Sequence, residues 1–362
     1  MNETGYQVFE ELGKRDHEQV IFCRDEVSGL RAIIGIHNTV LGPALGGCRM
    51  FPYASERDAL IDVLRLSRGM TYKAAVAGLN LGGGKAVIIG DPKADKSEIL
   101  WRAFGRYLEG LGGRYITAED SGTTMEDMEM IRLETRHVTG ISRSVGGSGD
   151  PSPVTAFGVF SGMKAAVEER FGRSDFRGLK IAVQGVGHVG YHLVGHLVEA
   201  GARVVVADID LENVRKAVTD HGVEAVSPDE IYDVDCDVFA PCAMGAIVNE
   251  ETIPRLSCKL IAGAANNQLR DEATDALMLG ERKILYAPDF VINAGGLMNV
   301  AKELEGYNQE RALNQAASIY SIMKRVLERA NKHNIHTFRA ANNLAMDRIE
   351  LVGQVRRTCT GR

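Results

Sequence analysis

Three observations predict an α/β protein built from two domains. In both halves of the chain, short apolar runs typical of buried strands alternate with longer stretches that carry apolar residues at helical spacing. A glycine-rich hexapeptide at 185–190 stands between one such strand and one such helix. Residues 136–153, rich in Gly, Ser and Pro, separate the two halves and are typical of a linker.

The composition narrows the class of protein. The chain has 362 residues, 45% of them hydrophobic and 25% charged, with a formal net charge of −6 at pH 7. The acidic balance argues against a nucleic-acid or anionic-membrane partner. No apolar run approaches the roughly 20 residues that span a bilayer, and the N-terminus lacks the basic and apolar regions of a signal peptide. We therefore expect a cytoplasmic protein that binds neither nucleic acid nor membrane.

Neither the cysteines nor the histidines predict a metal site. The six cysteines form no C-x-x-C pair and no zinc spacing, so we expect reduced thiols. His188, His192 and His196 recur at four-residue spacing on one face of a predicted helix, but no carboxylate or cysteine completes a tetrahedral set. We interpret them as a solvated or oligomer-facing stripe and predict no functional metal.

The first half opens as a hairpin. Residues 18–23 and 30–37 predict two strands joined by a turn at 25–29. A glycine-rich loop is expected over 42–47, followed by a helix that Ser55 and Asp58 start and that ends near Lys73. A strand from Lys85, a helix over 97–108 and a strand over 115–117 complete an α/β domain.

Lys73 and Lys85 stand on either side of a glycine-rich segment. Gly78 and the glycines at 82–84 let the backbone fold closely, so we expect both ammonium groups to face one cavity. Two neighbouring lysines repel each other, and the more desolvated one loses its proton more readily and becomes a general base. The alternative is a pair of ordinary surface lysines, which the apolar and glycine neighbours disfavour.

The second half predicts a dinucleotide site of the Rossmann type. A strand over 179–184, a G-x-G-x-x-G run, a helix to Ala200 and a strand over 203–208 follow one another. The run lets a pyrophosphate approach the backbone at the helix N-terminus, and it consists of Gly185, Val186, Gly187, His188, Val189 and Gly190. Asp208 would hold the adenosine ribose hydroxyls and repel the extra phosphate of NADP, so we predict NAD as the cofactor.

Three further strands, over 238–240, 260–262 and 284–286, are followed by loops that carry Ala243, Asn266 and Asn293. Ligands of doubly wound sheets lie beyond the carboxyl ends of the strands, so these loops should line the nicotinamide end of the cofactor. Plain turn chemistry is the alternative for the two asparagines. The stretches 297–329 and 337–355 predict helices.

Three motifs, at 42–47, 69–85 and 117–120, resemble in their sequence and order the amino-acid dehydrogenases of the glutamate/leucine/phenylalanine/valine family, and most nearly its leucine enzymes. The resemblance covers nearly the whole chain. It implies reversible oxidative deamination, in which an L-2-amino acid, NAD and water give a 2-oxo acid, ammonium and NADH. It also implies a substrate domain of residues 1–140 plus about 335–362, an NAD-binding domain of residues 141–334, a cleft between them, and a homo-oligomer, either octamer or dimer.

The resemblance also implies a role for each polar site residue. Protonated Lys73 would pair with the substrate α-carboxylate, while neutral Lys85 would hydrogen-bond the amine and then activate water. Asp120 would accept from the amine and shuttle a proton; its alternative is to cap the helix that opens at 123–124. The backbone of Gly46 and the side chain of Met70 would frame the substrate.

Three apolar residues bear on specificity. Leu45 takes the place where the glutamate enzymes carry a lysine, so a charged substrate side chain would be buried without a partner. Ala118 resembles the leucine enzymes, whereas Leu297 resembles the phenylalanine enzymes. Because one methylene discriminates weakly, we expect leucine, isoleucine and valine all to react. An enzyme for phenylalanine or another aromatic amino acid is the first alternative. A non-catalytic NAD-binding regulator is the second.

Overall fold

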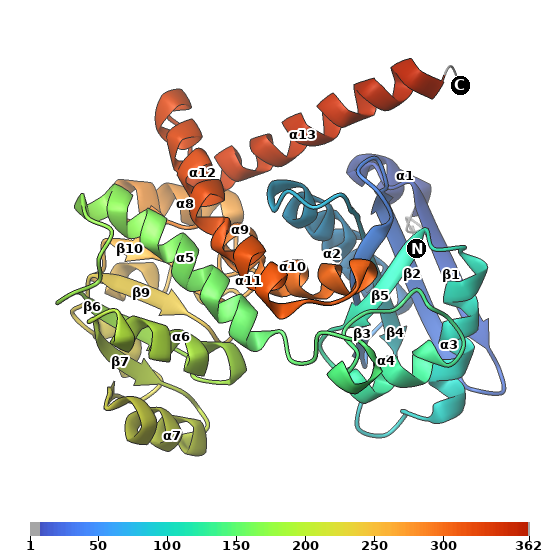
Figure 1. Ribbon diagram of the computed structural model, residues 1–362, viewed down its shortest axis with the longest axis horizontal. Helices are drawn as coiled ribbons and strands as arrows, with labels where there is room; N and C mark the ends of the chain where they lie inside the picture. Colours follow the sequence, from blue (N-terminus) through green and yellow to red (C-terminus); the bar gives the residue numbers. More distant parts are fainter. Residues whose placement is uncertain (1–7, 361–362) are drawn as a thin grey trace, which may run out of the picture. The chain divides into compact units, whose positions relative to one another are not determined.

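The computed structural model describes residues 8–360, which form two compact units (Figure 1). One unit comprises the chain up to Asp150, Val300–Tyr307 and the part from Ala345 onward; the other comprises Pro151–Asn299 and Asn308–Leu344. The chain thus leaves the first unit at Asp150 and not at residue 140, and it returns finally at Ala345 and not at about 335. The sequence did not indicate the short return at 300–307. Residues 1–7, 361 and 362 of the predicted domains lie outside the described part.

The first unit contains a five-stranded sheet of order β1-β2-β4-β3-β5. Its strands are β1 (Gln19–Asp25), β2 (Leu30–Asn38), β3 (Ala44–Phe51), β4 (Gly82–Ile89) and β5 (Tyr115–Glu119). The predicted hairpin is confirmed, since β1 pairs antiparallel with β2 and β2 pairs antiparallel with β4. Strand β3 runs parallel to both β4 and β5, so these three strands end at the same edge.

Four helices accompany this sheet: α1 (Val8–Arg15), α2 (Glu56–Val76), α3 (Glu98–Gly110) and α4 (Met125–Arg132). Helix α2 starts as predicted, because the Ser55 side chain accepts a hydrogen bond from the Asp58 backbone. Alternate residues of a strand face opposite sides of a sheet. Ile33 and Val87 accordingly pack with α2 on one face, and Ile34 packs with α3 and α4 on the other.

The prediction of a loop over 42–47 was wrong, because β3 begins at Ala44. Strand β4 likewise begins at Gly82, which places Lys85 inside the strand and not at its start. Glycine has a low preference for strands, which hid both elements. Close packing requires it here: a Cβ added to Gly46 would lie 1.8 Å from the Gly84 carbonyl oxygen, and one added to Gly84 would lie 2.6 Å from the Tyr115 ring.

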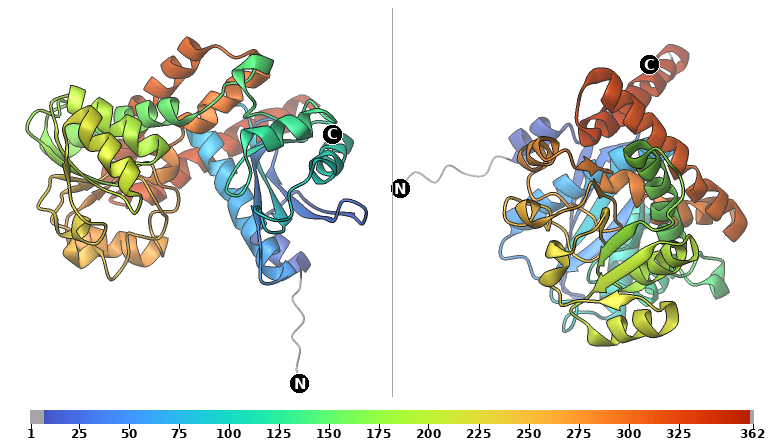
Figure 2. Two further views of the ribbon diagram at one scale, coloured as in Figure 1. Left: turned by 90° about the horizontal axis from the view of Figure 1, so that it is seen from below. Right: turned by 90° about the vertical axis from the view of Figure 1, so that its left-hand side faces the viewer.

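The second unit is a doubly wound α/β domain, as predicted. Its sheet has the order β11-β10-β9-β6-β7-β8 and every pairing in it is parallel. Helices lie on both of its faces (Figures 1 and 2). The strands are β6 (Lys180–Gln184), β7 (Arg203–Ala207), β8 (Glu224–Ala225), β9 (Val238–Pro241), β10 (Leu260–Ile261) and β11 (Leu285–Tyr286). All but the short β8 were predicted.

Helix α5 (Ser152–Phe171) follows the linker. The helix predicted to end at Ala200 is present as α6 (His188–Glu199). The predicted stretches 297–329 and 337–355 correspond to α10 (Gly295–Ala301), α11 (Gln309–Ala317), α12 (Ile319–His333) and α13 (Thr337–Thr360). Three helices were not predicted, namely α7 (Leu211–His221), α8 (Glu272–Glu281) and α9 (Asp289–Ile292). Short 3-10 turns occur at Arg143–Val145, Glu230–Asp233, Ile253–Arg255 and Lys302–Glu305. The predicted helical stretch 297–329 is therefore interrupted, because the chain re-enters the first unit between α10 and α11. Within the described chain, no helix has the length and apolarity needed to cross a membrane.

Candidate active site

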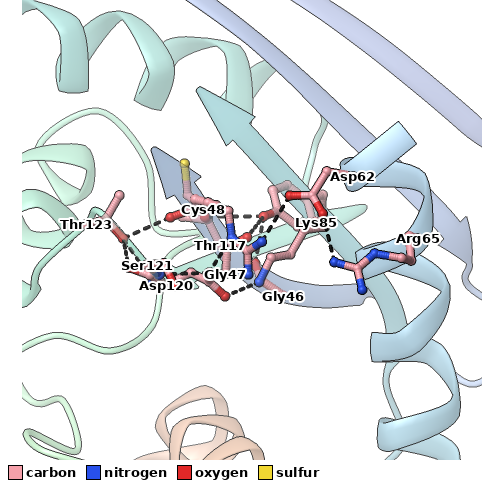
Figure 3. Close-up of polar contacts among 12 residues, drawn as sticks. Gly46, Gly47, Cys48, Asp62, Arg65, Lys85, Thr117, Asp120, Ser121 and Thr123 are labelled. Carbon is pink, nitrogen blue, oxygen red and sulfur yellow. Dashed lines mark hydrogen bonds and ion pairs between the residues drawn. The ribbon is translucent and has the colours of Figure 1, made fainter. Parts of the chain in front are cut away.

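An ion pair between Lys85 and Asp120 forms the centre of the site in the first unit. Lys85 lies in β4 and Asp120 directly follows β5, with β3 between the two strands. The Lys85 ammonium donates to Oδ2 of Asp120 (Figure 3). Lys85 is only 4% exposed. At Gly47 of β3, an added Cβ would stand 2.8 Å from Cβ of Asp120, so the lack of a side chain there leaves room for the pair.

Asp120 has a second cationic partner. Nε of Arg49, on β3, lies 3.1 Å from Oδ1 of Asp120, and the backbone N–H of Ser121 donates to the same oxygen at 2.7 Å. Burial by itself raises the pKa of the Asp120 carboxyl, but the charges of Lys85 and Arg49 and the hydrogen bonds outweigh it and hold that pKa well below its usual range. Asp120 is therefore an ionised acceptor and not a helix cap, since Thr124 caps α4.

Helix α2 brings the other predicted residues of the first unit to this sheet. Lys73 lies half-buried in its last turn. A Cβ added to Gly83 of β4 would lie 2.1 Å from the Thr71 nitrogen, so α2 lies directly against the strand that carries Lys85. One added to Gly46 would stand 3.2 Å from Cγ of Met70, which places Met70 over β3. The segments that bear the two lysines are therefore in contact.

The glycine-rich turn after β6 has the geometry of a phosphate-binding loop. Gly185 has a φ of 98°, and a Cβ added to it would lie 2.5 Å from Cβ of Ala243. The backbone of Gly190 lies close to that of Gly185, because a Cβ added to Gly190 would lie 2.0 Å from the Gly185 carbonyl oxygen. At Gly187, the N-cap of α6, an added Cβ would meet nothing within 4 Å, and no side chain caps the helix. The turn is therefore open at Gly187, and no side chain takes the capping position that an anion occupies at such a helix N-terminus.

Asp208 and Asn293 lie at the same carboxyl edge of the second sheet. Asp208 follows β7, and its carboxylate accepts from the Val186 backbone at 2.7 Å and the Asp210 backbone at 2.9 Å, which leaves further lone pairs available. Nδ2 of Asn293 donates to Oδ1 of Asn266 at 2.8 Å. Oδ1 of Asn293 is buried without a hydrogen-bond partner. A bound molecule with an N–H donor would satisfy that atom, so this edge fits the predicted dinucleotide.

Comparison with known sequences now decides the family. Residues 17–137 match the family model described as the Glu/Leu/Phe/Val dehydrogenase dimerisation domain. Residues 146–212 and 206–356 match the Glutamate/Leucine/Phenylalanine/Valine dehydrogenase model. This chain belongs to the glutamate/leucine/phenylalanine/valine dehydrogenase family. It is therefore an amino-acid dehydrogenase, a pyridine-nucleotide-dependent oxidoreductase that acts on CH–NH2 donors.

Individual relatives of this dehydrogenase confirm the resemblance read from the motifs. A leucine dehydrogenase of Thermoactinomyces intermedius is 57% identical over 97% of this chain and 96% of its own length. A phenylalanine dehydrogenase of the same organism is 48% identical over the same shares of the two chains. The crystal structure of L-tryptophan dehydrogenase from Nostoc punctiforme superposes with a TM-score of 0.85 at 46% identity, over 96% of this chain and 99% of that one.

The predicted specificity residues of this dehydrogenase fall in different units. Leu45 of β3 and Ala118 of β5 both belong to the first unit and are buried, at 1% and 7% exposure. Gly47 pairs with Ala118 across the two strands, so Ala118 lies beside the strand that separates Lys85 from Asp120. Leu297 is buried in α10 of the second unit.

The described part of this dehydrogenase, residues 8–355 for side chains, holds no group of three or more His, Cys, Asp or Glu that could bind a metal ion. Of the stripe predicted to be solvated or oligomer-facing, His196 instead packs against the rings of Phe157 and Phe160 of the same chain, and burial lowers its pKa. The described cysteines are free thiols, namely Cys23, Cys48, Cys236, Cys242 and Cys258. Cys359 lies outside the described side chains.

Sequence reasoning missed Arg49 and its partner Asp62. Arg49 lies within β3, and the first residues of that strand had been predicted to form a loop. Its two carboxylate partners, Asp120 and Asp62, are 71 and 13 residues away in sequence. A charged residue in a predicted buried strand would have been the signal, because such a residue needs a partner.

Proposed function

We propose that this dehydrogenase catalyses the reversible NAD-dependent oxidative deamination of branched-chain L-amino acids, leucine and also valine and isoleucine, to 2-oxo acids and ammonium. The observation that carries this proposal is the buried Lys85–Asp120 pair beside the glycine strand β3. The higher identity to a leucine dehydrogenase than to a phenylalanine dehydrogenase, 57% against 48%, supports the branched-chain preference.

In this proposal the residues of the first unit bind the substrate and move its protons. NAD, when bound, would supply the acceptor for the hydride of the amino-acid Cα. Lys73 pairs with the α-carboxylate and fixes Cα for that transfer. Lys85, neutral at work, hydrogen-bonds the amine and then takes a proton from the water that adds to the iminium carbon. As the carbon–nitrogen bond breaks, the nitrogen receives the hydroxyl proton and the proton held by Lys85, so that ammonium leaves and the 2-oxo acid remains. The backbone of Gly46 and the side chain of Met70 frame the substrate.

Asp120 takes a narrower role than the sequence suggested. A carboxylate whose pKa lies well below its usual range accepts hydrogen bonds but is a poor carrier of protons near neutral pH. We therefore keep its role as the acceptor that orients the substrate amine and Lys85, and we omit the proton shuttle.

The second unit supplies the proposed NAD site. The pyrophosphate would rest on the turn from Gly185 to Gly190, including Val186, His188 and Val189, where Gly187 is open and the α6 N-terminus lacks a cap. Asp208 would accept from the ribose hydroxyls and repel the 2′-phosphate of NADP. Ala243, Asn266 and Asn293 would face the nicotinamide end, where the unpaired Asn293 oxygen can accept from its carboxamide.

The substrate pocket and the assembly are also part of the proposal. Leu45 and Ala118 of the first unit would give the substrate side chain an apolar surrounding that excludes glutamate. Leu297 of the second unit would bear on the choice between aliphatic and aromatic substrates. An aromatic amino acid is the alternative substrate, supported by the 48% identity to a phenylalanine dehydrogenase. The partners are small molecules and further copies of the chain in a homo-oligomer, either dimer or octamer; the description of the N-terminal family model as a dimerisation domain supports an oligomer. The free thiols fit a cytoplasmic location.

A substrate panel tests this proposal. NADH or NADPH formation is followed with L-leucine, valine, isoleucine, phenylalanine and glutamate, each with NAD and with NADP. We expect the branched-chain substrates to lead with NAD. A Lys85→Met variant should lose activity on all of them while it still binds NADH, as seen in cofactor fluorescence. Activity led by phenylalanine would favour the aromatic alternative, and NADH binding without turnover of any amino acid would support a non-catalytic regulator.

A further inference from the structure

Arg49 bridges two carboxylates beside the proposed catalytic pair. Its Nε lies 3.1 Å from Oδ1 of Asp120, and its Nη1 lies 3.0 Å from Oδ2 of Asp62. The three side chains are mostly buried, with exposures of 23% for Arg49, 21% for Asp120 and 16% for Asp62. A guanidinium donates along fixed directions, so two such contacts define where Arg49 lies and how it is turned.

The two oxygens of Asp120 have different partners. Oδ2 accepts from the Lys85 ammonium (Figure 3), while Oδ1 accepts from Arg49 at 3.1 Å and from the Ser121 backbone at 2.7 Å. Rotation of the carboxylate would break both sets of contacts. Arg49 thus holds the carboxylate oxygen that Lys85 does not contact.

Asp62 in turn anchors Arg49 to helix α2. Its Oδ2 also accepts from the Tyr53 hydroxyl at 2.7 Å, and its Oδ1 accepts from Arg65 at 3.0 Å. Burial alone would raise the pKa of Asp62, but the hydrogen bond from Tyr53 and the charge of Arg49 outweigh it and lower that pKa. Asp62 is therefore an ionised partner, and it links the helix that carries Lys73 to the pair on β4 and β5.

We propose that Arg49 is a positioning residue for the deamination reaction, which holds the Asp120 carboxylate in place beside Lys85. This inference rests on the proposed function. In this inference neither Arg49 nor Asp62 contacts the substrate or the cofactor. Arg49 acts through its contact with Asp120.

Lys85 and Arg49 both act on Asp120, and their charges help to hold the pKa of its carboxyl well below its usual range. Without Arg49, Oδ1 of Asp120 would lose its charged partner and keep the Ser121 backbone N–H, so the carboxylate would be held less firmly beside Lys85.

The test is kcat and KM for oxidative deamination at neutral pH and saturating NAD. For Arg49→Met we expect kcat to fall about 3- to 10-fold. KM for the amino acid should change less than kcat, since Lys73 is untouched. Arg49→Lys keeps the charge and should recover part of the lost kcat, but not all of it, because lysine cannot bridge both carboxylates.

Two further variants separate this role from a structural one. Arg65→Gln removes an exposed partner of the same Asp62, so its kcat and KM should match those of the wild type. Asp62→Asn leaves Arg49 charged but loosens its anchor, so it should lower kcat with little change in KM; it also serves if Arg49→Met fails to fold. An active wild type whose kcat is unchanged in Arg49→Met, or in Asp62→Asn where Arg49→Met does not fold, overturns the inference alone. A wild type that deaminates no amino acid overturns the proposed function, and the inference with it.

Discussion

Two histidines beneath helix α2 should make the stability of the first unit fall in mild acid. Nδ1 of His37 lies 2.8 Å from Oγ1 of Thr71, and its Nε2 lies 3.0 Å from the Arg15 carbonyl oxygen. Nε2 of His17 lies 2.9 Å from Oγ of Ser67, and the two imidazole rings meet edge to face at 4.8 Å. The pKa of both imidazoles is lowered to about 4, mainly by burial and, for His17, also by the nearby His37.

The sign of the effect follows from proton linkage. In the unfolded chain a histidine titrates near 6.5, whereas folded His37 takes up its proton only near pH 4. Between these values the unfolded state binds more protons, so the free energy of unfolding falls as the pH is lowered from about 6.5 towards 4. Between pH 8 and pH 5, His37 by itself should cost about 2 kcal/mol. His17 adds to this loss, but less than independently, because the two charges would repel each other.

The single tryptophan of the chain provides the assay. Trp101 is 2% exposed and lies in α3 of the first unit, so its fluorescence reports urea unfolding of that unit. The midpoint and slope are measured at pH 8, 6.5 and 5 for the wild type and for His37→Gln. The variant should be less stable at pH 8, yet lose about 2 kcal/mol less than the wild type on going to pH 5. His333→Gln, which removes an exposed imidazole, is the control and should follow the wild type. Equal pH dependence in the wild type and in His37→Gln would refute the reasoning.

Three further substitutions test how α2, β3 and β4 are held. Arg348→Met removes a guanidinium that donates to the Leu79 carbonyl oxygen at 2.6 Å, in the turn after α2. In urea, the free energy of unfolding should fall by about 1.5–3 kcal/mol. An unchanged unfolding midpoint would contradict this prediction. Gly46→Ala places a Cβ 1.8 Å from the Gly84 oxygen, so β3 must shift, and steady-state assays should show kcat reduced at least about 100-fold. Gly69→Ala, by contrast, adds a methyl on the exposed side of α2 where nothing lies within 4 Å, and should raise stability by about 0.5–1 kcal/mol with normal activity.

The elements that the sequence predicted well are those specified by local signals. Helix α2 was found because Ser55 and Asp58 form a cap and the apolar residues that follow recur at helical spacing. The β6–α6–β7 unit was found because an apolar strand, a glycine turn and an acidic residue stand close together in sequence. Each of these signals acts within a few residues and needs no knowledge of the rest of the chain.

The features that the sequence did not reveal depend on distant partners. Arg49 is paired with carboxylates far away in sequence, and nothing near it indicates them. The return of residues 300–307 to the first unit is similar: the Glu303 carboxylate accepts from the Gly140 backbone at 3.1 Å and from the Ser148 backbone at 2.8 Å, more than 150 residues earlier. Nothing near Glu303 in the sequence indicates that its carboxylate binds the backbone of Gly140 and Ser148.

The glycines of β3 and β4 explain why the sequence marked this region by its motifs but did not predict the bounds of the two strands. They lower the local preference for a strand, so the sequence favoured a loop where a strand exists. In the folded chain the same absence of side chains lets β3 approach β4 until a Cβ at Gly46 would overlap the Gly84 carbonyl, and leaves space at Gly47 beside Asp120. A buried lysine on β4 can then reach a carboxylate after β5 across the intervening strand. The residues that weaken the strand signal are thus the ones that allow the ion pair to form. A methyl group at Gly46 or Gly47 should therefore shift β3 and disturb the Lys85–Asp120 pair together.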